Sequence, residues 1–174
     1  MNRAKVGVLV ALVAMAGALA CRKGPREDRK AAAQALALQR LAQYKRIAIV
    51  CAPAQGADPA YADIILNEVK AKAPAYFAEL EACECLSGVP VDTSAVPPRP
   101  SLGAAPTNYD GVFCLVYEYG AGRVVLHFYL VDTRTGAQAW YHKLDTRDAD
   151  VVARLKRHGW WACSTIKNRF YRGR

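Results

Sequence analysis

Two cysteines one residue apart, Cys83 and Cys85, form the pattern in this sequence that most resembles reactive chemistry. Paired thiols can hold a metal ion or exchange disulfides. A zinc site needs a second pair of ligands, which a single C-x-C lacks. The pattern also lacks the C-x-x-C spacing at a helix N-terminus that lowers a thiol pKa. We therefore expect an inert pair, and a thiol redox protein using Cys83 and Cys85 remains an alternative.

The other residues that could do acid–base chemistry are scattered. His127, His142 and His158 show no metal-ligand spacing, although the strands expected to carry His127 and His142 should pair and could bring them close. Ser164 lies six residues after His158 on one predicted helix, on roughly the opposite face. G-x-S-x-G, H-E-x-x-H, phosphate-loop and G-x-G-x-x-G motifs do not occur. We expect a protein that is not an enzyme, with no catalytic residue, no metal and no cofactor.

A short apolar leader ends at a cysteine. Arg3 and Lys5 precede an uncharged run over residues 6–20, and Cys21 follows directly. The run is shorter than the about 20 residues of a membrane-spanning helix, and a basic start with small residues at the end is typical of a secretory signal peptide. Residues 17–21, GALAC, resemble the lipobox of bacterial lipoproteins. This resemblance implies a signal peptide over 1–20 and a mature N-terminus at Cys21 carrying diacylglyceryl and acyl (palmitate) chains. A plain membrane anchor, or a cleaved leader with a coincidental cysteine, is the alternative.

The residue after the cysteine and the net charge indicate the surroundings of the mature protein. Arg22 stands where this family places Asp to keep lipoproteins in the inner membrane, so the resemblance implies the outer membrane, facing the periplasm. Cleavage removes two basic residues and lowers the net charge from +9 to +7. Such a surface favours anionic neighbours, such as lipid head groups, an anionic envelope polymer or an acidic protein. Nucleic acid is not an expected partner in that compartment.

The remaining cysteines are odd in number. Five follow Cys21, and two of them, Cys51 and Cys114, lie in apolar runs. Because cysteine is buried readily as a small hydrophobic residue, we expect mostly buried thiols and at most one or two disulfides.

Periodicity and turn residues divide the chain into a tether with an Ala-rich helix, 21–45, and a domain, 46–174. The helix of the tether is expected over 27–44. The first half of the domain is expected to contain a strand at 46–53 buried on both faces, a helix at 59–80 capped by Asp58 and bent or broken at Pro74, and a short strand near 83–91. A Pro-rich surface loop at 92–108 is expected to follow. The last elements expected are three antiparallel strands between 109 and 145 and a helix at 148–171 whose apolar seam includes Gly159. Gly159 is expected to allow close approach to the sheet.

This order of elements predicts an α/β (α+β) fold, with one mixed sheet and helices packed mainly on one face. Residues 109–112, YDGV, and 130–136, LVDTRTG, with Trp140 after them, resemble the domain shared by curli-secretion-channel-like proteins, lipoprotein activators of penicillin-binding proteins and the N-terminal part of TolB. The resemblance covers about residues 44–170 in outline. It implies a turn held by Asp132 and Thr135 and closed by Gly136, with no chemistry.

The C-terminal helix combines cations with tryptophans, a composition suited to a protein interface or a membrane surface. The candidate partner-binding residues are Arg154, Arg157, Trp160, Trp161, Lys167 and Arg169. We expect a lipid-anchored binding or accessory protein of assembly, secretion or peptidoglycan machinery, acting through this helix or the Pro-rich loop. A solvated face without a partner, or a subunit of an oligomeric secretion pore or ring, remains an alternative. The sequence leaves the oligomeric state open.

Overall fold

A computed structural model describes residues 25–103, 108–147 and 150–173. It contains two compact units, Met1–Ala33 and Gln34–Arg174. In the first unit the described residues form the start of helix α2, which spans Pro25–Gln43. The remainder of α2 and all the other elements belong to the second unit.

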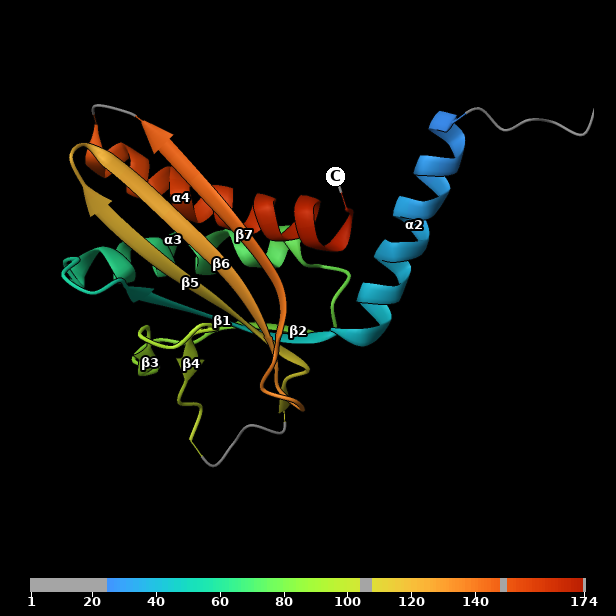
Figure 1. Cartoon of the computed structure of the whole chain (residues 1–174), viewed down its shortest axis with the longest axis horizontal. Helices are drawn as coiled ribbons and strands as arrows, with labels where there is room; N and C mark the ends of the chain where they lie inside the picture. Colours follow the sequence, from blue (N-terminus) through green and yellow to red (C-terminus); the bar gives the residue numbers. More distant parts are fainter. Residues whose placement is uncertain (1–24, 104–107, 148–149, 174) are drawn as a thin grey trace, which may run out of the picture. The chain divides into compact units, whose positions relative to one another are not determined.

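The second unit contains a five-stranded mixed sheet with the order β2-β1-β5-β6-β7 (Figure 1). Parallel pairing joins β1 (Arg46–Pro53) to β2 (Ala82–Cys85) and to β5 (Gly111–Gly120). Strands β5, β6 (Arg123–Asp132) and β7 (Gln138–Arg147) form an antiparallel meander. The mixed sheet and the meander predicted from the sequence are therefore confirmed.

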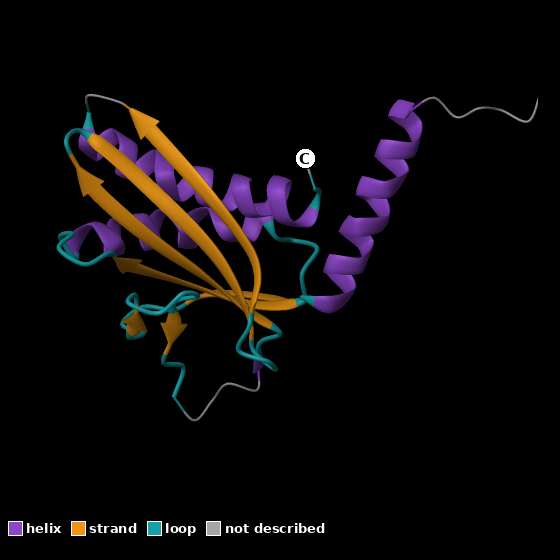
Figure 2. Cartoon of the chain, in the orientation of Figure 1, coloured by secondary structure: helices purple, strands orange, loops and turns teal. Residues whose placement is uncertain are grey.

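Helices cover one face of this sheet, as the sequence predicts (Figure 2). They are α3 (Ala60–Tyr76) and α4 (Val151–Thr165), which continues as the π-helix η2 (Ile166–Tyr171). The alternate residues of β6 predicted to share a face, Val124, Leu126, Phe128 and Leu130, are buried in the core on this side. Strand β1 is buried on both faces, because Ile47 and Ile49 face the helices while Ala48 and Val50 belong to a second cluster.

The second cluster lies on the opposite face of the sheet. Val112 and Val131 belong to it, and Leu86, Val91 and Leu102 pack against it. Two short strands, β3 (Val91–Asp92) and β4 (Arg99–Pro100), pair there as a separate antiparallel sheet. The Pro-rich segment predicted as a long surface loop over 92–108 therefore contains the end of β3 and all of β4 within its described residues, and its Leu102 contributes to the apolar cover of this face.

Helix boundaries differ from the sequence expectation at both helices of the domain. Helix α3 passes through Pro74 and ends at Tyr76, earlier than the expected end at residue 80. A proline inside a helix leaves one carbonyl without its amide donor, and the helix ends within two residues of it. Helix α4 begins at Val151, later than the expected start at residue 148. It is capped by Asp150, whose carboxylate accepts a hydrogen bond from the Ala153 amide at 3.0 Å.

Gly159 permits a close approach, as expected, but the neighbouring element is α3 and not the sheet. A Cβ atom at this position would lie 2.0 Å from Cβ of Glu68 and 2.9 Å from its carbonyl carbon. The absence of a side chain at Gly159 therefore sets the distance between α3 and α4.

Candidate functional site

The paired cysteines lie on β2, where they face the main core and are half-buried. Cys83 stands beside Ile47 of β1 and Cys85 beside Ile49. Burial raises the thiol pKa of both residues, that of Cys85 to about 11. A thiol with such a pKa is protonated at neutral pH and is a poor nucleophile, which opposes redox chemistry at this pair.

The other described cysteines are also shielded. Cys114 and Cys163 are buried, and desolvation raises the pKa of each to about 12. All five cysteines within the described ranges are free thiols, so these ranges hold no disulfide.

His127 and His142 lie on opposite faces of the sheet and do not meet. His127 is opposite Lys143 in the β6–β7 register, so the adjacent His142 points the other way. The Nδ1 atom of His127 lies 2.9 Å from the Tyr141 hydroxyl on the exposed face. The ring of His142 stacks on Trp140, with a centroid separation of 5.8 Å. The pairing of their strands therefore does not bring His127 and His142 together, because side chains alternate between the two faces along a strand.

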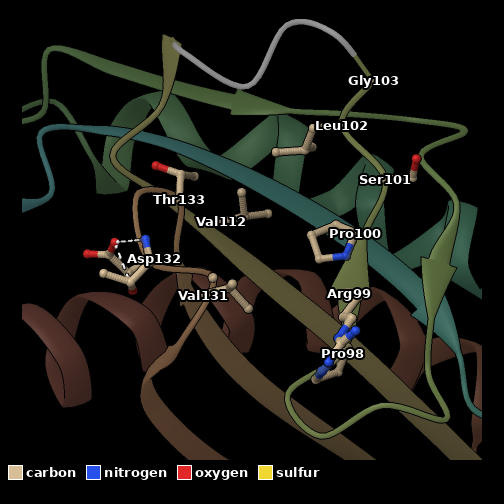
Figure 3. Close-up of a pocket in the computed structure, with 12 residues that line it drawn as sticks. Pro98, Arg99, Pro100, Ser101, Leu102, Gly103, Val112, Val131, Asp132 and Thr133 are labelled. Carbon is tan, nitrogen blue, oxygen red and sulfur yellow. Dashed lines mark hydrogen bonds between the residues drawn. The ribbon is translucent and has the colours of Figure 1, made fainter.

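The turn after β6 borders a hollow of about 620 Å³ beneath the segment 98–103 (Figure 3). Figure 3 shows Asp132 and Thr133 on one side, Pro98 and Leu102 on the other, and Val131 between them. The carboxylate of Asp132 accepts from the amides of Arg134 and Thr135, each at 3.0 Å. These bonds confirm the turn role of Asp132.

The remaining polar groups of this turn are also engaged in structure. The Tyr44 hydroxyl donates to the second oxygen of Asp132 at 3.1 Å, and the Thr133 hydroxyl donates to the Tyr109 carbonyl at 2.6 Å. The hydrogen bonds from Arg134 and Thr135 lower the pKa of Asp132 against the opposing effect of its burial. Because its carboxylate is held as an anion by these donors, this group supports the turn and is poorly suited to act as an acid at neutral pH.

The six candidate residues of the C-terminal helix separate into different environments. Arg154 is completely buried, and its guanidinium donates to the Thr146 carbonyl at 3.1 Å. Lys167 is paired with the end of α3, where its Nζ atom donates to the Tyr76 carbonyl at 2.6 Å and lies 3.1 Å from Glu79. Arg154 is therefore not part of the candidate surface, because its side chain is completely buried. Lys167 joins two helices.

Two candidates share an exposed face of α4. Arg157 is exposed, and Trp160, one turn further on, is 45% exposed. Lys156, which the sequence reasoning did not single out, is exposed beside them. Positions i, i+3 and i+4 of a helix lie on one face, and this spacing could have identified Lys156. We call Lys156, Arg157 and Trp160 the α4 stripe.

Trp161 and Arg169 lie instead along the groove between α4–η2 and β7. Two adjoining hollows of about 390 and 440 Å³ share Leu144, Ser164 and Thr165. Trp161 lines the first hollow, and Arg169 lines the second. The structure therefore does not unite the six candidates in one site.

The part of the chain that the structure describes contains neither a cluster of metal ligands nor a membrane-spanning helix. Within it, no three His, Cys, Asp or Glu side chains cluster as metal ligands would. None of its helices is both long and apolar enough to cross a membrane. Cys21 and the predicted signal peptide lie outside the described residues.

The sequence matches no protein-family model, and no curated protein sequence matches it. Several solved structures have a similar fold. The PelC dodecamer from Paraburkholderia phytofirmans is 16% identical, with a TM-score of 0.43 over 72% of this chain and 89% of that one. TolB from Acinetobacter baumannii is 14% identical, with a TM-score of 0.44 over 72% of this chain and 28% of TolB. Lipoprotein GNA1162 from Neisseria meningitidis is 17% identical, with a TM-score of 0.42 over 71% of this chain and 97% of that one.

These likenesses concern the fold alone. TolB and an envelope lipoprotein, which the resemblance of the β6–β7 hairpin motif names, are among these structures.

Proposed function

We propose that this protein is a lipid-anchored, non-catalytic binding protein of the bacterial envelope, which engages an acidic partner protein through the α4 stripe. The observation that carries the proposal is the exposure of Trp160 beside Lys156 and Arg157 on a helix whose opposite face is buried in the core. Tryptophan and arginine are among the residues most enriched at energetically important positions of protein interfaces. Attachment at Cys21 would confine the domain and raise its effective concentration near a partner in the same envelope.

A non-catalytic role is supported by the chemistry of the described residues. The thiols have raised pKa values, and the carboxylate of Asp132 is engaged in its turn. The cations of the α4 stripe favour an acidic partner surface, since charge complementarity steers association and suppresses wrong partners.

Anchoring is tested at the lipidation residue. Cys21→Ser is expected to move the full chain from the membrane fraction to the soluble or unprocessed fraction, because no thiol remains to receive lipid. Mass spectrometry of the parent chain should show an N-terminus at Cys21 with a diacylglyceryl and an acyl group. A parent chain with an unmodified Cys21 or an intact leader contradicts the anchor.

Partner binding is tested by crosslinking in cells that express the full chain, with the captured proteins identified by mass spectrometry. The double substitution Lys156→Glu and Arg157→Glu is expected to abolish capture of a specific partner. Trp160→Ala is expected to weaken that capture at least about tenfold, the effect of a typical interface anchor. The matched control is Arg29→Glu with Lys30→Glu, which makes the same charge change at two exposed residues of α2. Equal capture by the two double variants would exclude the stripe as the binding face.

A further inference from the structure

The two edges of the main sheet differ in length. The edge strand β2 has four residues, whereas β7 has ten. A long edge strand presents a row of backbone donors and acceptors that can pair with another chain. Natural proteins commonly shorten, cover or charge such an edge. Strand β7 keeps its length and carries charges, so the order of those charges decides what it can pair with.

The side chains of β7 have a self-complementary order. Tyr141, Lys143, Asp145 and Arg147 point to the exposed face of the sheet, while His142, Leu144 and Thr146 point to the helix side. Reading outward from Leu144, Lys143 on one side matches Asp145 on the other, and Tyr141 matches Arg147. We propose that β7 pairs with β7 of a second copy of this chain, antiparallel and centred on Leu144, which joins the two sheets into one.

The charges select this register over its neighbours. Centred on Leu144, the pairing places Lys143 opposite Asp145 of the second copy twice, by the two-fold symmetry of such an interface. Each Arg147 lies opposite a tyrosine, Tyr141, over whose ring a cation is attracted. Centring on Lys143 instead would oppose two lysines, and centring on Asp145 would oppose two aspartates. Like charges directly opposite each other destabilise a strand pair.

The surroundings of β7 fit this arrangement. Arg123 of β6 already pairs with Asp145 within the chain, so Lys143 of the second copy would extend that pair into a network. The groove between β7 and α4 offers Leu144 and Trp161 as apolar contacts on the helix side. The half-buried Leu144 would meet its own symmetry mate there.

The first test reverses charges in the full, detergent-solubilised chain and measures its dimer dissociation by sedimentation. Lys143→Glu and Asp145→Lys are each expected to weaken the dimer about tenfold or more, since each creates two like-charge pairs. The double variant restores opposite charges in the same register and is expected to recover most of the affinity. Circular dichroism verifies that each variant is folded. A monomeric parent chain, or a double variant weaker than both single variants, overturns the proposal.

The second test fixes the register by oxidative crosslinking in membranes. Leu144→Cys places the new thiol opposite its own copy, within the Cα separation of 4.4–6.8 Å usual for a disulfide. Thr146→Cys places the two thiols four residues apart along the strands, about 13 Å. A dimer band for Leu144→Cys alone is expected, and equal bands for both variants would overturn the register. The α4-stripe double variant should still form the dimer, so this test and the partner-capture test fail independently.

Discussion

Lowering the pH from 7 to 4 is expected to reduce the free energy of unfolding by about 3 kcal/mol through His158 alone. His158 is fully buried on α4, and neither of its ring nitrogens has a hydrogen-bond partner among the described residues. Burial, together with the charge of Arg154, lowers its pKa from 6.5 to about 4. In the unfolded chain the imidazole takes up its proton near pH 6.5, so stability falls as the pH drops from about 6.5 towards 4 and levels off below that.

Urea unfolding at a series of pH values measures this effect. His158→Gln removes the titrating group and should leave a much flatter pH dependence above pH 4. Ser164→Ala, on the same helix, changes no titratable group; it is the control and should retain the slope of the parent chain. Identical slopes for the two variants would show that His158 is not the group responsible.

Replacing Gly159 with alanine is expected to destabilise the domain by about 2 kcal/mol. The new methyl group would lie 2.0 Å from Cβ of Glu68 and within 3.0 Å of its backbone, so α3 and α4 must move apart. Overpacking of this kind costs up to about 3 kcal/mol. The better helix propensity of alanine returns about 1 kcal/mol.

The matched control is Gly120→Ala at the end of β5. A Cβ atom there meets nothing within 4 Å, so the substitution should change stability by less than about 1 kcal/mol. The urea midpoints of the two variants measure the difference. If the Gly159→Ala protein is as stable as the parent chain, α3 and α4 can move apart with little loss of stability. That result would contradict the prediction that Gly159 is required for their close packing.

Several features could be predicted from the sequence because each depends on neighbouring residues. The alternation of β6 identified the face that is buried, and the Asp132–Gly136 turn followed from residues that bond to each other. The apolar seam of the C-terminal helix correctly placed Leu155 and Ala162 of α4 and Ile166 of η2 in the core. Periodicity of this kind is set within one element, so it does not depend on which other element packs against that face.

The candidate site could be predicted only in part. The basic aromatic character of α4 was evident from the sequence. Arg154 and Arg157, however, are only three residues apart and differ in burial. Arg154 lies under the sheet end, bonded to the Thr146 and Gly122 carbonyls at 3.1 and 3.5 Å, while Arg157 is exposed. The sequence could not distinguish them, because burial depends on which carbonyls another element brings within reach.

By itself, therefore, the sequence determined the order of elements, the two-faced strands and helices, and the turn that joins β6 to β7. The tertiary structure decided that Gly159 meets α3, that the Pro-rich segment covers the second face of the sheet, and that β7 forms the long edge. The physical reason is that hydrogen bonds and periodicity within one segment are fixed by its own residues. Burial, thiol and imidazole pKa values and sheet edges depend on contacts between segments far apart in the chain.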